Sequence, residues 1–266
     1  MFLQYFGLKF NPFSKEVPVE KMYMSQDLQE LTQRLKYLQT TRGIGLVAGE
    51  PGAGKTTTLR KYASELNPSL YRHCYFSLST VTVSEFYQGL ALELGEEPAF
   101  KKVAIFRQIQ QAICSMYYDN RITPVIILDE IHLASSKLLE DLRLIFNFKM
   151  DSQNPFILIL SGQSTIRNKL GMNVNRPLKQ RLAVKYVMQG LKKEEISDYC
   201  NSRLKQAGQV EDIITEGATE VLYANSNGLP RVVNSLMSNS LIYACNQNLR
   251  IIDEEVIYHA QNELNI

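Results

Sequence analysis

The stretch GEPGAGKT at residues 49–56 decides the fold. It follows a short apolar run at residues 44–48 and opens a helical pattern at residues 55–66. Glycines at three of its positions let backbone N–H groups turn inward, and a helix N-terminus adds the positive end of its dipole. A strand, a glycine-rich loop and a helix in this order predict a loop that encloses phosphate groups.

Each residue type in this loop has a predicted role. Lys55 is expected to reach the β- and γ-phosphates of ATP, and Thr56 to bind Mg²⁺ through its hydroxyl. The expected cofactors are therefore ATP and Mg²⁺. The residues expected to bind the nucleotide are Gly49, Glu50, Pro51, Gly52, Ala53, Gly54, Lys55, Thr56 and Thr57.

A second apolar run, VIILDE at residues 125–130, ends in two acids. We expect Asp129, at the end of the strand, to hold Mg²⁺ directly or through water. Glu130 would then polarise the attacking water as a general base. The alternative is that the two acids only precede and cap the helix predicted at residues 137–148.

Apolar runs alternate with helical patterns over the first 188 residues. Strands are expected at 44–48, 71–78, 124–128, 156–160 and 183–188, and helices at 25–40, 55–66, 83–95, 102–119, 137–148 and 176–182. The run at 71–78 alternates weakly, but the strands are mostly apolar runs rather than alternating ones, which predicts a parallel sheet covered by helices on both faces. We therefore expect an α/β fold of the P-loop NTPase type.

The chain beyond residue 189 carries no strand signal. Helical patterns are expected there at 193–207, 215–226, 230–246 and 253–263. The expected organisation is a nucleotide-binding core with an N-terminal linker at residues 1–188 and a helical lid at residues 189–266. Residues 1–24 read as irregular and aromatic.

Composition narrows the class of protein. The 266 residues are 45% hydrophobic, and 29 basic against 27 acidic side chains give a net charge of +2, which does not by itself argue for nucleic acid. The four cysteines form no CxxC pair, so they suggest free thiols rather than a zinc site or disulfides. No signal peptide and no membrane-spanning run is visible, so a cytoplasmic protein is expected.

Three later elements complete a resemblance to the AAA+ superfamily. The first is PFILILSGQS at residues 155–164. In that superfamily a polar residue at the end of this strand contacts the γ-phosphate or the water, and Gln163 is the closest match, with Ser161 as the second candidate. The alternative is an ordinary polar strand end.

The other two elements are arginine motifs. Leu178–Arg181 resembles the arginine-finger box, so the resemblance implies that Arg181, or Arg176 as second choice, contacts the nucleotide of a neighbouring subunit. GLPR at residues 228–231 resembles the sensor-2 motif, in which Arg231 reaches the nucleotide from the start of a helix. A surface arginine and a capped surface helix are the respective alternatives.

The opening YFGLKFNPF at residues 5–13 is similar to the ExeA-like group of AAA+ ATPases, in which this segment packs near the adenine. One branch of that group serves secretion and carries a membrane helix and a peptidoglycan-binding segment, neither of which is visible here. The other serves transposition and is similar to phage Mu B protein and the TnsC-type target-selection ATPases. We expect the transposition branch.

That resemblance implies an ATP-dependent filament or ring of this chain on double-stranded DNA, which recruits or stimulates a transposase. DNA contacts in relatives follow the second strand, where this sequence has Thr80, Thr82, Lys101, Lys102 and Arg107. A solvated basic surface is the alternative. Two other functions stay open: a secretion or envelope assembly ATPase acting on protein partners, and an ATP-binding regulator without significant turnover.

Overall fold

Five parallel strands form the single sheet in the part of the chain that the computed structural model describes, which is residues 1–16, 18–78 and 82–264. The strands are β1 (Gly43–Gly49), β2 (Tyr71–Ser77), β3 (Thr123–Asp129), β4 (Ile157–Gly162) and β5 (Leu182–Met188). Their order is β2-β3-β4-β1-β5, and every neighbouring pair runs parallel. The predicted α/β fold with a parallel sheet is confirmed.

The chain divides into two compact units. The sheet unit comprises residues 31–49 and 55–188, and the helical unit comprises residues 1–30, 50–54 and 189–266. The domain boundary predicted between residues 188 and 189 stays a prediction.

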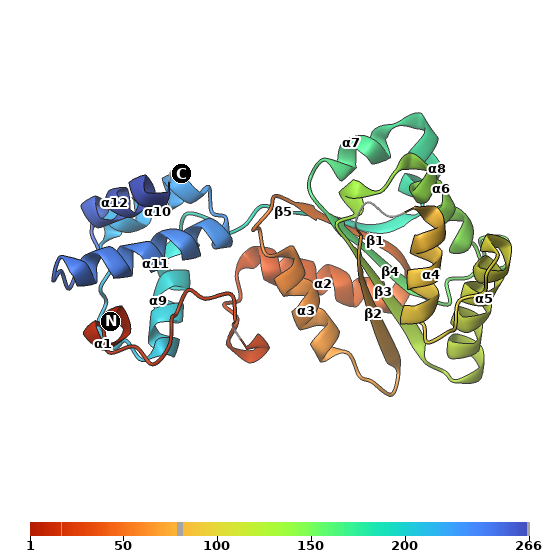
Figure 1. Cartoon of the computed structure of the whole chain (residues 1–266), viewed down its shortest axis with the longest axis horizontal. Coiled ribbons are helices and arrows are strands. Elements are labelled where there is room, and N and C mark those ends of the chain that lie inside the picture. The colour runs from red at the N-terminus through yellow and green to blue at the C-terminus, as the bar shows by residue number, and fades with distance from the viewer. Residues whose placement is uncertain (17, 79–81, 265–266) are drawn as a thin grey trace. The chain divides into compact units, whose positions relative to one another are not determined.

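Helices cover both faces of the sheet. Figure 1 shows α2 and α3 on one face and α4, α5 and α6 on the other. The helices that accompany the sheet are α2 (Gln26–Thr41), α3 (Lys55–Glu65), α4 (Val83–Glu93), α5 (Lys102–Cys114), α6 (Ser136–Ile145), α7 (Ile166–Gly171) and α8 (Arg176–Gln180). Single helical turns lie at Ser115–Asp119, Ile131–Leu133 and Asn173–Asn175, of which the first is a π-turn.

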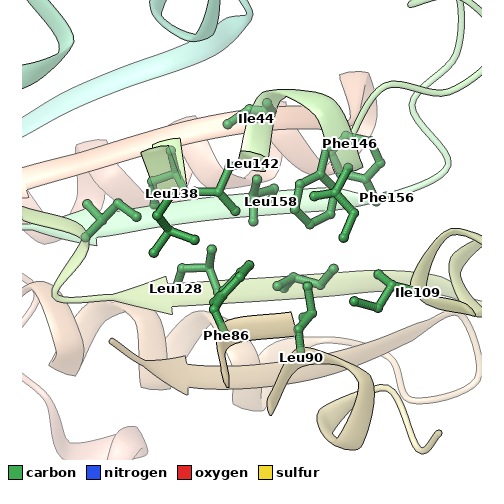
Figure 2. Close-up of a cluster of buried hydrophobic side chains, with 14 of the residues drawn as sticks. Ile44, Phe86, Leu90, Ile109, Leu128, Leu138, Leu142, Phe146, Phe156 and Leu158 are labelled. Carbon is green, nitrogen blue, oxygen red and sulfur yellow. The ribbon is translucent and has the colours of Figure 1, made fainter. Parts of the chain in front are cut away.

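The larger hydrophobic core lies between the sheet and helices α4, α5 and α6 (Figure 2). Phe86 and Leu90 of α4 and Leu142 of α6 face Leu128 of β3 and Leu158 of β4, and all five side chains are fully buried. The continuous apolar runs of the strands are explained by this burial, because both faces of each central strand are covered.

Several predicted helices end at a different residue in the structure. The helix expected at 137–148 stops at Ile145, and residues 149–151 follow in left-handed conformations with φ of 45°, 55° and 66°. The helix expected at 102–119 ends its regular part at Cys114 and continues as the π-turn. The short helices α1 (Phe2–Tyr5) and α7 were not predicted.

The helical unit contains α9 (Glu195–Ala207), α10 (Glu216–Ser226), α11 (Pro230–Asn246) and α12 (Glu254–Leu264), with α1 and a 3₁₀ turn at Val19–Lys21. Phe6, Leu8 and Phe13 of the N-terminal segment are buried in one cluster with apolar residues of these helices. Over the described residues, no helix has both the length and the apolar character to cross a membrane.

Arg203 of α9 fastens the N-terminal segment to this unit. Its Nε donates to the carbonyl of Pro12 at 2.6 Å, and a terminal nitrogen donates to the carbonyl of Ser14 at 2.8 Å. Only 6% of Arg203 is exposed, so these carbonyls would lose their partners inside the protein if the guanidinium were removed.

We expect Arg203→Met to lower the free energy of unfolding by about 3 kcal/mol, because the buried Pro12 carbonyl and the partly buried Ser14 carbonyl lose a charged donor. Trypsin should also cut faster at the exposed Lys15. The matched control is Lys205→Met on the same helix, whose side chain is 62% exposed. Equal stability of the two variants in denaturant titrations would contradict the role of Arg203 in holding the N-terminal segment.

Candidate nucleotide site

The glycine-rich loop begins where β1 ends, at Gly49, and closes where α3 begins, at Lys55. Gly52 and Gly54 have φ of 90° and 101°, a region that side chains other than glycine rarely adopt. The ammonium of Lys55 donates to the carbonyl of Gly49 at 2.8 Å, and the residue is 9% exposed. The turn is therefore a strand-to-helix loop that only these glycines permit, with a lysine held beside its first residue.

The carboxylate of Asp129 gathers hydroxyls from three other elements. On Oδ2 it accepts hydrogen bonds from Thr56 of α3 at 3.1 Å and from the Tyr75 hydroxyl of β2 at 2.9 Å. On Oδ1 it accepts from Ser161 of β4 at 2.8 Å and from the backbone N–H of Glu130 at 2.9 Å. Asp129 is 3% exposed, so these donors compensate for the burial of its charge.

These oxygens fit the ligand preference of Mg²⁺, which takes one or two carboxylates and completes its shell with phosphate and water oxygens. The Thr56 hydroxyl and the Asp129 carboxylate supply one oxygen each at the end of the phosphate loop. Over the described residues, no group of three or more His, Cys, Asp or Glu side chains could hold a metal by itself. Thr57 is exposed in the first turn of α3.

Tyr75 is a member of this cluster that the sequence did not reveal. Burial, and then the hydrogen bond to Asp129, raise the pKa of Tyr75 to about 12, so its hydroxyl remains a donor at neutral pH. The only local signal was weak alternation along residues 71–78. The register that brings Tyr75 beside Ile127, two residues before Asp129, is a property of the assembled sheet.

Glu130 has a strained backbone and a histidine partner. Its φ of 57° is left-handed, which is uncommon for a residue other than glycine and typical of functional sites. Its Oε2 lies 3.3 Å from Nδ1 of His132, and the backbone N–H of Gln163 points at the same Nδ1 at 3.4 Å. Nδ1 can accept from Gln163 only when it is deprotonated and can donate to Glu130 only when it is protonated, so the two contacts compete.

The two sensor candidates occupy different places. Ser161 is the last-but-one residue of β4, fully buried, and bound to Asp129. Gln163 follows the strand and is half-buried, with its backbone beside His132. Ser161 therefore contacts the carboxylate expected to bind the metal, whereas Gln163 lies on the side of Glu130. Which of them senses the γ-phosphate stays a prediction.

The two arginine-finger candidates also differ. The guanidinium of Arg181 donates to the carbonyls of Arg143 and Phe146 at 2.9 and 2.8 Å, and it pairs with Asp151 at 2.5 Å. It thus satisfies carbonyls at the C-terminal end of α6, and it would have to leave them to reach another subunit. Arg176 is exposed at the start of α8. The finger role of Arg181 stays a prediction.

Arg231 lies against the glycine-rich loop. Pro230 occupies the first turn of α11, as predicted, and the backbone N–H of Arg231 donates to the carbonyl of Gly52 at 3.4 Å. A Cβ on Gly52 would come within 2.8 Å of the Cβ of Arg231. Residue 52 must therefore be glycine both for its φ and for this approach.

The residues predicted to contact DNA differ in whether their side chains are already engaged in other contacts. Lys102 pairs with Asp141 at 3.0 Å, and Thr82 caps α4 through a reciprocal bond with Glu85. Lys101 and Arg107 are exposed at and after the start of α5. Thr80 lies outside the described residues.

A family model described as an AAA domain matches residues 38–170. The chain belongs to this family. The match includes β1, the phosphate loop, Asp129 and β4, so the Asp129 cluster lies within the shared domain.

One sequence relative and two solved structures of similar fold can be compared with this AAA-domain chain. General secretion pathway protein A of Aeromonas hydrophila is 30% identical, over 92% of this chain and 45% of the relative, so the chain spans less than half of that protein. Cdc6p of Pyrobaculum aerophilum superposes with a TM-score of 0.69 at 18% identity, covering 95% of this chain and 70% of that one. The Aeropyrum pernix ORC1 protein in complex with DNA superposes with a TM-score of 0.67 at 17% identity, covering 95% and 68%.

We expect Tyr75→Phe to raise the Mg²⁺ concentration needed for half-maximal ATP binding by about tenfold, because the carboxylate predicted to bind the metal loses an orienting hydrogen bond. Direct ATP-binding titrations at fixed nucleotide and increasing Mg²⁺ measure this shift. Tyr71→Phe, at the opposite end of the same strand, is the control. The same Mg²⁺ requirement in both variants would rule out the orienting role of Tyr75.

We expect Arg181→Gln to lower the free energy of unfolding by about 2 kcal/mol, since two helix-end carbonyls lose a charged donor. Arg176→Gln, an exposed change, should stay within about 0.5 kcal/mol of the starting protein. Denaturant titrations followed by circular dichroism compare the two. If Arg181→Gln were as stable as Arg176→Gln, the contacts at the end of α6 would not be structural.

Proposed function

We propose that this AAA-domain chain binds ATP with Mg²⁺ at residues 49–56 and hydrolyses it to ADP and phosphate. The observation that carries the proposal is the Asp129 carboxylate, which is bonded to the Thr56 hydroxyl at the start of the loop helix. This pair provides a metal-binding edge directly after the glycine-rich turn. Mg²⁺ bound there would neutralise charge on the β- and γ-phosphates.

The remaining side chains would act on the water and the phosphates. Glu130 takes a proton from the water, whose oxygen bonds to the γ-phosphorus while the bond from that phosphorus to the oxygen of ADP breaks. Lys55 balances charge on the β- and γ-phosphates, and Gln163 or Ser161 contacts the γ-phosphate or the water. We assign His132 to hold the Glu130 carboxylate, given their separation of 3.3 Å.

Two arginines would complete the site. Arg231 adds a cation beside the loop, and its backbone contact with Gly52 supports that position. Arg181 or Arg176 would come from a neighbouring copy of the chain and couple hydrolysis to assembly. We retain the division into a core at residues 1–188 and a helical lid at residues 189–266 as part of this proposal.

We further propose that the chain assembles as a filament or ring on double-stranded DNA and regulates a transposase in the cytoplasm. The Aeropyrum pernix ORC1 protein, which has a similar fold, was solved in complex with DNA. The exposed Lys101 and Arg107 offer phosphate contacts that need no base reading. The four free cysteines suit a reducing compartment.

The second candidate is an ATPase that serves secretion by acting on protein partners. It is favoured by the 30% identity with the secretion pathway protein of Aeromonas hydrophila. The two candidates share the ATPase and differ in the partner that stimulates it, so DNA is the reagent that separates them.

We expect double-stranded DNA to raise the ATPase rate at low salt and to lose this effect at physiological salt, because phosphate contacts release counterions. Steady-state ATPase rates and sedimentation with ATP, with and without DNA, test this expectation. An ATPase rate that DNA does not change at either salt concentration would overturn the transposition proposal in favour of the secretion candidate. The proposal that the chain hydrolyses ATP would still hold.

The same assay locates the DNA contacts. The double change Lys101→Gln with Arg107→Gln should reduce the salt dependence of DNA binding by about two units of slope, one for each lost phosphate contact. Lys102→Gln is the matched control, because Lys102 is already paired with Asp141. An equal loss in the control would place the DNA surface elsewhere.

A further inference from the structure

A hollow of about 320 Å³ lies within the sheet unit. Its walls come from the end of α2 with Arg42, from the π-turn with Tyr117 and Tyr118, and from the segment 152–155 before β4. The hollow is of the size at which small-ligand sites begin, about 300 Å³. Polar side chains dominate its walls, so a charged or strongly polar occupant fits it better than an apolar one.

Arg42 contributes a cation that has no acceptor. Its guanidinium carbon lies 4.8 Å from the centre of the Tyr117 ring, and its Nε is buried without a hydrogen-bond partner. Over the described residues, the Arg42 side chain forms no ion pair and no hydrogen bond. A half-buried guanidinium without an anion is costly, and its planar edge of two N–H groups matches an oxyanion.

A second cation stands beside the hollow. Lys149 Nζ lies 5.0 Å from the centre of the Tyr118 ring, and the two tyrosine rings meet edge to face at 5.0 Å. Lys149 opens the run of three left-handed residues, and Asp151 at the end of that run is paired with Arg181. The Asp151 carboxylate of this loop is therefore already paired, and Lys149 is a second cation near the hollow, where Asp119 at the end of the π-turn is another charged side chain.

The hollow is separate from the nucleotide site. Arg42 directly precedes β1 and Pro155 comes shortly before β4, so the hollow lies where these strands begin. Gly49 and Asp129 lie where the parallel strands end. A strand of seven residues spans about 20 Å, so a ligand in the hollow cannot be the ATP of the glycine-rich loop.

We propose that this hollow is a second anion site, which binds a phosphate group through the guanidinium of Arg42 with Lys149 adding long-range attraction. Two cations favour the higher charge of a phosphate over a single carboxylate. The phosphate belongs either to a small phosphorylated molecule or to a nucleic-acid backbone. This proposal does not rest on ATP hydrolysis or on the transposition function.

The test measures binding of inorganic phosphate by equilibrium dialysis in a Lys55→Ala background, which weakens the phosphate loop. We expect Lys55→Ala to retain one phosphate per chain. Adding Arg42→Gln should weaken that binding about tenfold or more, since a charge-assisted pair of hydrogen bonds is lost. Arg42→Lys should lose part of the affinity, because it keeps the charge but not the fork.

The matched control is Arg121→Gln. Arg121 is an exposed arginine with the same φ of 59° as Arg42, it directly precedes the approach to β3, and it does not line the hollow. Thermal unfolding of both variants checks that the fold is retained. The proposal is wrong if Lys55→Ala binds no phosphate, or if Arg42→Gln and Arg121→Gln bind it equally.

Two additions identify the source of the phosphate. Displacement of bound phosphate by a short DNA duplex supports a nucleic-acid backbone, and simultaneous binding of both supports a small phosphorylated molecule. Acetate is the third probe. If acetate bound as tightly as phosphate and was lost in the same variant, the assignment to phosphate would be overturned.

Discussion

The carboxylate of Asp129 is the point on which the candidate nucleotide site depends. A buried negative charge is stable only when it is surrounded by donors, and here the donors come from α3, β2 and β4. That requirement fixes the relative position of the start of α3 and the ends of β2, β3 and β4. The strand order β2-β3-β4-β1-β5 satisfies it, since it places the end of β3 between the neighbours that supply Tyr75 and Ser161.

The sequence predicted those elements whose structure is determined by residues close together in the chain. Apolar runs and weak alternation predicted the five strands, and the helical pattern at residues 230–246 predicted that Pro230 starts α11. The glycine-rich loop lies between strand and helix as its pattern requires. Each of these features is set by residues within a few positions of one another, so periodicity and caps were sufficient.

Features that depend on distant residues could not be predicted in this way. Tyr75 joins the site only through the register of β2 against β3, and Arg181 is engaged only because the end of α6 lies beside it. The arginine motif fits a finger and a structural cap equally well in sequence. The burial of Phe6 and Phe13 among the helices of the helical unit likewise follows from packing between segments far apart in the chain.

The most direct test of the proposed mechanism is turnover by Glu130→Gln, compared with Glu140→Gln, an exposed change on α6. We expect Glu130→Gln to bind ATP and Mg²⁺ like the starting protein, but to lose nearly all single-turnover hydrolysis and to stay trapped in its ATP-bound assembly. The control should hydrolyse ATP normally. Equal hydrolysis by both variants would contradict Glu130 as the base, and no hydrolysis by the starting protein would leave a switch that binds ATP without turning it over.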